Sequence, residues 1–182
     1  MDFPGQAPTP LFVHTWTRWA GGFDKSGLDG AMSLASLTWP VASTAFYTPV
    51  YIPWPYQVER VFWINGTSVT SVNMDFGIYT ASGNKIYTTG STAESGASAT
   101  QYVTPGTKIV LSPGRYYFAL ACDSTVAARG GQGSSSGTLP RNRMAGILQQ
   151  ASALPLPATM TGIAATNVCS PLCGVTRLTT GF

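Results

Sequence analysis

One serine of this 182-residue chain lies at the centre of a Gly-x-Ser-x-Gly pattern, Gly133-Ser134-Ser135-Ser136-Gly137. In hydrolases that pattern forms a strained turn between a strand and a helix, which exposes the serine hydroxyl as a nucleophile. No helical pattern follows Ser135, and the single histidine, His14, lies far upstream instead of downstream. We therefore interpret residues 129–138, which are rich in Gly and Ser, as a flexible loop.

Acid–base hydrolysis would require two carboxylates in one cleft. The chain has seven in all: Asp2, Asp24, Asp29, Glu59, Asp75, Glu94 and Asp123. Only Asp24 and Asp29 are near one another in sequence. Their spacing does not fit an EF-hand calcium loop, so we interpret them as part of a polar turn, with calcium as the alternative. We expect no catalytic residue, no cofactor and no enzymatic activity.

The cysteines offer a second kind of chemistry. Cys169 and Cys173 flank Ser-Pro-Leu, but without a second pair of ligands they do not indicate a structural zinc site. A disulfide between them, or from them to a neighbouring chain, is the alternative hypothesis to reduced thiols. Cys122 ends an alternating apolar segment and is predicted to be a buried, inert thiol. His14, among apolar neighbours, is interpreted as a packing residue.

Aromatic side chains could bind sugars, because exposed rings stack against pyranose faces. The chain has five Trp, eight Tyr and eight Phe, most of which we expect in the core. Trp54, Tyr56, Tyr79 and Tyr87 lie at or near strand ends or turns. These four could form a glycan platform or a protein contact, but core or intersubunit packing is the interpretation that we favour over sugar binding.

Composition indicates a β-rich protein. Charged residues make up 9% of the chain, against roughly 25% in ordinary soluble domains. Ser, Thr, Gly and Pro, which favour strands and turns, take their place. A chain with so little charge also suits a surface that neighbouring subunits cover.

Charge and hydropathy exclude two classes of partner. The net charge is +3, and the basic residues are spread along the chain without the clustered stripe that nucleic-acid binding needs. No run of about eighteen apolar residues predicts a membrane span. The first residues lack a basic leader and an apolar run, so we expect synthesis and assembly in the cytoplasm.

The elements that would position these residues are strands. Apolar and polar residues alternate between turn signals placed every eight to twelve residues, which is typical of sandwiches and barrels. Residues 72–78 show the clearest alternation, and we expect that strand to be half buried. Asn65-Gly66 and Ser82-Gly83-Asn84 are predicted hairpin turns. Pro53 and Pro55 bracket Trp54 and predict an edge or a corner.

We predict an all-β fold, an antiparallel, jelly-roll-like β-sandwich with irregular arms at both ends. Residues 1–47 are predicted as an N-terminal docking arm with a short helix over Asp29–Leu37. Residues 48–160 are predicted as the sandwich, and residues 161–182 as a C-terminal arm. The chain is long enough for one well-buried domain.

Parts of the predicted sandwich resemble jelly-roll-like modules of tailed-bacteriophage structural proteins. The resemblance covers roughly residues 48–160 and is carried by glycines at turns and alternating apolar residues in strands: 48–53, 58–66, 75–79, 83–87, 111–121 and 149–159. None of these motifs is a catalytic signature.

The resemblance implies a location more than an activity. It implies a virion structural protein, in a capsid decoration, collar, tail or fibre, that contacts other virion proteins and forms a homo-oligomer. Since some modules of this kind bind host glycans, host attachment through a carbohydrate-binding module is the alternative function.

Overall fold

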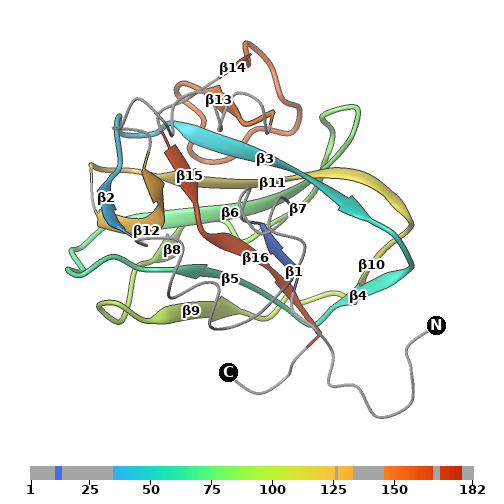
Figure 1. Cartoon of the computed structure of the whole chain (residues 1–182), viewed down its shortest axis with the longest axis horizontal. Helices are drawn as coiled ribbons and strands as arrows, with labels where there is room; N and C mark the ends of the chain where they lie inside the picture. Colours follow the sequence, from blue (N-terminus) through green and yellow to red (C-terminus); the bar gives the residue numbers. More distant parts are fainter. Residues whose placement is uncertain (1–10, 14–34, 126, 133–145, 166–168, 178–182) are drawn as a thin grey trace.

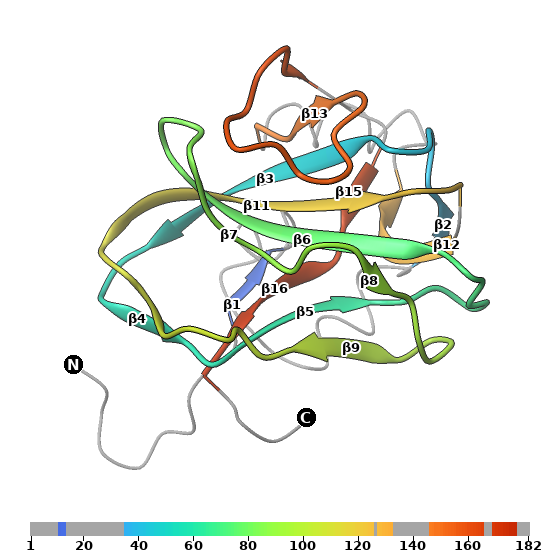
Figure 2. The ribbon, with the colours of Figure 1, turned by 180° about the vertical axis from the view of Figure 1, so that it is seen from behind.

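The computed structural model describes residues 11–13, 35–125, 127–132, 146–165 and 169–177. Within these segments the chain forms strands and turns, and no helix is present. All of the strand pairs are antiparallel. Figures 1 and 2 show two facing layers, so the predicted all-β, antiparallel β-sandwich is confirmed.

The larger layer is a seven-stranded sheet. Its main path runs β14 (Ala164–Ala165), β13 (Leu148–Gln150), β3 (Ala45–Ile52), β11 (Gly114–Cys122), β6 (Asn73–Thr80) and β7 (Lys85–Thr88), and β8 (Thr92–Ala93) also pairs with β6. The central strand β11 pairs with β3 on one side and β6 on the other. Sequence-distant segments therefore meet at β11.

The second layer is a four-stranded sheet in the order β1 (Leu11–Val13), β16 (Cys173–Thr176), β5 (Arg60–Ile64) and β9 (Thr100–Val103). Two smaller sheets lie beside the layers: β10 (Ile109–Leu111) with β4 (Tyr56–Val58), and β15 (Cys169–Pro171), β12 (Ala127–Gln132) and β2 (Ala35–Thr38).

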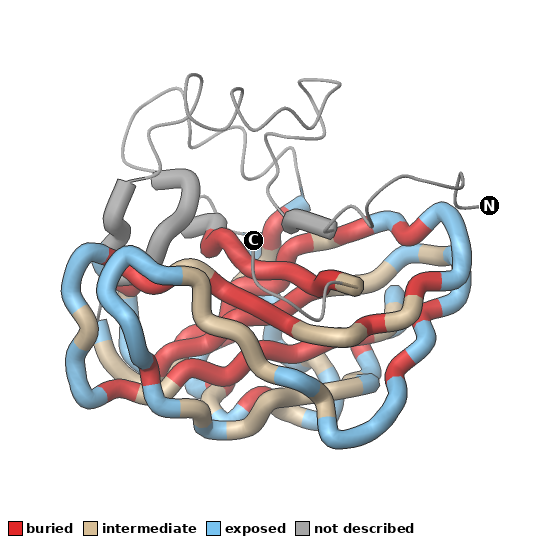
Figure 3. Tube along the Cα trace, turned by 90° about the horizontal axis from the view of Figure 1, so that it is seen from below, coloured by how far each residue is buried: buried red, intermediate tan, exposed pale blue. Residues whose placement is uncertain are grey.

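The main core lies between the two layers and is built mainly from β3, β5, β6, β11 and β16. Figure 3 shows that the buried residues gather in the strands of the interior. Phe76 and Phe118 from β6 and β11 meet with ring centroids 5.8 Å apart. Cys122 is completely buried, as its place in the alternating segment predicts. Alternation is therefore the pattern that determines which side chains fill the core.

Part of the outer face of the large sheet is buried as well, which the sequence did not predict. A covering segment, residues 151–161, lies across that face and packs Ala153 and Leu156 onto Tyr47 and Tyr79. Strand β6 was expected to be half buried; instead its outward Asp75 and Tyr79 have no exposed surface. The reason is that residues far along the chain supply a third layer over this face.

Hydrogen bonds fix the covering segment. The backbone N–H of Leu156 donates to Asp75 Oδ2 at 3.0 Å, and Lys85 Nζ donates to the carbonyl of Leu156 at 2.7 Å. At the two ends of the segment, Ala153 N–H donates to the carbonyl of Ser43 at 2.7 Å and Met160 N–H to that of Gly83 at 2.9 Å. The segment is thus bound at several points along its length.

The predicted arms contribute strands to the fold. β16 lies inside the second layer between β1 and β5, and residues 173–176 are all buried. Residues 35–37 belong to strand β2, so the helix predicted over Asp29–Leu37 is wrong there; the rest of that range lies outside the described residues. Pairing with β12 gives these residues their backbone partners.

One predicted loop and one predicted turn also differ from what the structure shows. Arg129–Gln132 lie in strand β12 and not in a loop. Asn65-Gly66 is not a hairpin turn, because the chain passes there from the second layer to the large sheet. The side chain of Asn65 is buried and donates to the carbonyl of Ser95 at 2.6 Å. Ser82-Gly83-Asn84 does form the predicted β6–β7 hairpin, with Gly83 at φ 83°.

Candidate binding surfaces

The four aromatic residues predicted as a platform do not lie together on one surface. Trp54 lies at the corner between β3 and β4, as its flanking prolines predict, and is 48% exposed. Tyr56 and Tyr79 are buried. Tyr87 is half-buried and packs against the main core. Only Trp54 therefore presents a largely free ring, because the strands turn the others inward or beneath the covering segment.

Tyr79 is used inside the fold. Its hydroxyl donates to the carbonyl of Pro157 at 2.7 Å, and its ring meets that of Tyr47 edge to face with centroids 5.3 Å apart. The hydroxyl of Tyr47 donates to Gln150 Oε1 at 2.9 Å. Burial raises the pKa of Tyr47 to about 12 and also raises the pKa of Tyr79. Both phenols therefore support the covering segment in their neutral form.

The other candidate groups are the cysteines, the serine of the Gly-x-Ser-x-Gly pattern, the histidine and two aspartates. Cys173 is buried in β16 and Cys169 lies in β15, but the side chain of Cys169 is outside the described structure, so the disulfide stays a prediction. Ser135, His14, Asp24 and Asp29 lie outside the described residues. Among the residues that are described, no group of three or more His, Cys, Asp or Glu side chains could hold a metal ion.

Glu94 is a buried carboxyl group whose pKa is raised. Its side chain is 7% exposed, and burial raises its pKa above the ordinary value, against a weaker opposing hydrogen bond from the Thr70 N–H at 3.4 Å. The pKa of Glu94 is therefore higher in the folded state than in the unfolded state. The protein is then most stable at a pH below the unfolded-state pKa, and it loses this stability as the pH rises through the folded-state pKa.

We expect Glu94→Gln to raise the melting temperature at pH 7, because it removes a buried charge. The difference from the parent should shrink as the pH falls below about 4.5, where both states bind the proton. Thermal melts of the variant and the parent from pH 3 to 7 measure this difference in melting temperature. Glu59→Gln, at a partly exposed position, controls for net charge. A difference that did not change with pH would contradict this account.

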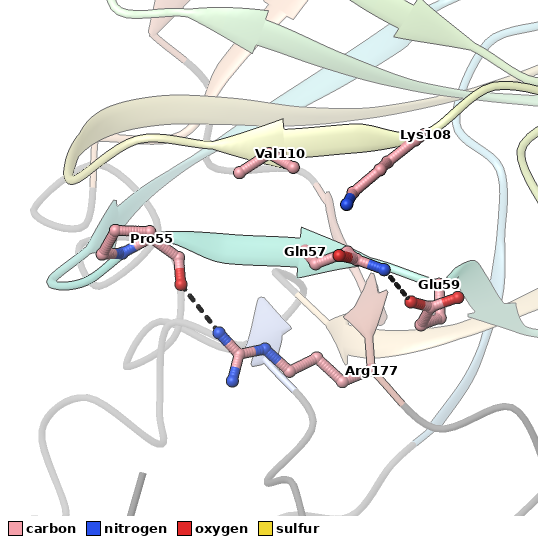
Figure 4. A pocket seen from close by; sticks show the side chains of 6 residues that line it. All are labelled: Pro55, Gln57, Glu59, Lys108, Val110 and Arg177. Atoms are coloured by element: carbon pink, nitrogen blue, oxygen red, sulfur yellow. Dashed lines mark hydrogen bonds between the residues drawn. The ribbon is translucent and has the colours of Figure 1, made fainter. Parts of the chain in front are cut away.

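One surface pocket, the corner pocket, lies over β4 and β10 and has a volume of about 530 Å³ (Figure 4). Its lining residues are Pro55, Gln57, Glu59, Lys108, Val110 and Arg177. Arg177, directly after β16, donates from Nη2 to the carbonyl of Pro55 at 2.7 Å and lies 4.6 Å from the ring centroid of Tyr56. These contacts tie the end of β16 to the corner after β3.

A second hollow, the tyrosine groove, lies on the outer face of the large sheet and has a volume of about 600 Å³. Its described lining comes from β3, from β11 and from the residue after β6: Pro49, Val50, Tyr51, Ala81, Arg115, Tyr116 and Tyr117. On the outer face, alternation places Pro49, Tyr51, Arg115 and Tyr117. Sequence reasoning missed it. The signal was present in the alternation of β11, which places Arg115 and Tyr117 on the face opposite Phe118.

Comparison with known proteins gives no family assignment. No protein-family model matches this chain, and no curated protein matches it. In the part of the chain that the structure describes, no helix is long and apolar enough to span a membrane.

Proposed function

We propose that this chain is a non-enzymatic structural component of a tailed-bacteriophage virion, in a capsid decoration or a tail, collar or fibre, which acts through contacts with other virion proteins. The observation that carries the proposal is an apolar surface on a charge-poor chain. Among the described residues, six large hydrophobic side chains are 42–60% exposed: Val41, Tyr51, Trp54, Ile86, Val110 and Ile163. Only 9% of all residues are charged.

Exposed apolar residues are normal when they are scattered singly over a surface. Here two of them flank one corner: Trp54 lies in the turn before β4, and Val110 lies in β10, which pairs with β4. An apolar surface of this kind suits burial against another subunit.

The path of the chain also suits attachment to an assembly. Leu11 in β1 pairs with Val175 in β16, so the first and last described strands of the sandwich lie side by side. Segments that flank the sandwich can therefore reach the same neighbouring subunit. This supports the docking role proposed for residues outside the sandwich.

Particle association is the test. We expect the chain to co-sediment with purified virions in a density gradient, at a fixed copy number relative to the major capsid protein. Quantitative mass spectrometry measures that ratio, with an abundant host protein as the control for carry-over. Cryo-electron microscopy of the same particles should then show a two-layered β density at a symmetric position. Recovery of the chain only in the soluble fraction would contradict the proposal.

The second candidate function is a carbohydrate-binding, host-recognition module. The largely exposed Trp54 and the tyrosine groove support it, since both present aromatic rings to solvent. A module of this kind would bind glycans as an isolated chain, whereas a purely structural subunit would not.

A further inference from the structure

The tyrosine groove lies where the covering segment leaves the outer face of the large sheet open. In the β3–β11 pair, Pro49 lies opposite Tyr117 and Tyr51 lies opposite Arg115. Since alternate residues of a strand share a face, these four side chains form one contiguous patch on the sheet. Ala81, which follows β6, lines the patch with only a methyl group.

The aromatic rings of the groove are accessible. Tyr51 is 50% exposed, and Tyr117 is half-buried beside the Tyr47–Tyr79 cluster, which holds it in place. A tyrosine ring offers an electron-rich face and a hydroxyl, and it loses little conformational entropy on binding. The C–H face of a pyranose carries positive partial charges and complements such a ring, while its hydroxyl groups suit the phenol.

Arg115 gives the groove its charge. Its side chain is exposed, and it makes no hydrogen bond or ion pair with the described residues. None of the described residues that line the groove is acidic. A guanidinium group is planar and binds a carboxylate through two parallel hydrogen bonds, so an anionic ligand would complete the pairing.

We propose that the tyrosine groove binds an acidic oligosaccharide, with a pyranose ring against Tyr51 and Tyr117 and a sugar carboxylate on Arg115. The ligand class follows from two features of the same groove, which has a volume of about 600 Å³: accessible tyrosine ring faces, and a guanidinium group that no described residue pairs. This volume lies within the range of small-molecule sites. The inference does not rest on the proposed structural role, and its residues differ from the platform that the sequence predicted.

The test is an array of glycans that contain uronic acids, sialic acids or only neutral hexoses, followed by calorimetry with the best acidic binder and its methyl ester. We expect binding to acidic glycans and at least tenfold weaker binding to the ester. Arg115→Gln should remove the preference for the acid, and Tyr51→Ala should weaken binding to both forms at least tenfold.

The chain offers a matched control in the second layer, where the guanidinium of Arg60 lies 5.6 Å from the ring centroid of Tyr102. Arg60→Gln should leave glycan binding unchanged. Circular dichroism melts show that each variant folds, which we expect since Tyr51 and Arg115 are exposed. Absence of binding to every acidic glycan, equal binding to neutral ones, or loss of binding in Arg60→Gln would overturn the proposal. Particle association is measured separately, so failure here leaves the structural role standing.

Discussion

Phe118→Ala is expected to lower the free energy of unfolding by about 4 kcal/mol, since a phenylalanine truncated in a well-packed core leaves a cavity. Phe118 is completely buried in β11, the central strand that joins β3 and β6. Its ring faces Phe76 and loses that partner in the variant. With domain stabilities of about 5–15 kcal/mol, such a loss would leave the fold marginal. Urea denaturation of the parent and the variant measures this change in the free energy of unfolding.

The control for this effect lies three residues away on the same strand. Arg115→Ala changes an exposed side chain on the opposite face, and we expect it to alter the free energy of unfolding by less than about 0.5 kcal/mol. Equal losses in the two variants would mean that β11 is not the centre of a two-layered core.

The fold class could be predicted from sequence because alternation in the long strands is strong. Residues 72–78 place Met74, Phe76 and Ile78 on one face, and all three are buried in the main core. The short strands could not be predicted in this way. β16 spans only residues 173–176 and includes a glycine, so it is too short to show a period, and its burial depends on partners at β1 and β5.

The site was harder to predict because exposure depends on tertiary packing. Tyr79 ends a strand near a hairpin, where aromatic residues are commonly accessible, yet the covering segment from residue 151 onward buries it. Tyr51 and Tyr117 lie within strands, where alternation alone does not show which face is open to solvent. They are accessible because the covering segment does not extend over their end of the sheet. The sequence alone cannot show where a distant segment crosses a sheet face.

The second large effect on stability is expected from a substitution beneath the covering segment. Asp75→Ala should lower the free energy of unfolding by about 2–3 kcal/mol. The carboxylate of Asp75 accepts hydrogen bonds from the Leu156 N–H and from the hydroxyls of Thr88 and Thr89. Each buried donor left without a partner costs about 1–3 kcal/mol, and the relief of a buried charge offsets part of that cost.

The effect should be concentrated in residues 151–161. We expect the Leu156 amide to exchange with deuterium at least tenfold faster in Asp75→Ala, because its hydrogen-bond acceptor is gone. Asp123→Ala is the matched control, since this partly exposed carboxylate accepts one hydrogen bond, from Asn73 Nδ2 at 2.8 Å, on the same sheet. It should cost less than about 1 kcal/mol and leave Leu156 protected. Unchanged exchange at Leu156 in Asp75→Ala would show that apolar packing of Leu156 and Ala153, and not the buried carboxylate, holds the segment on the sheet.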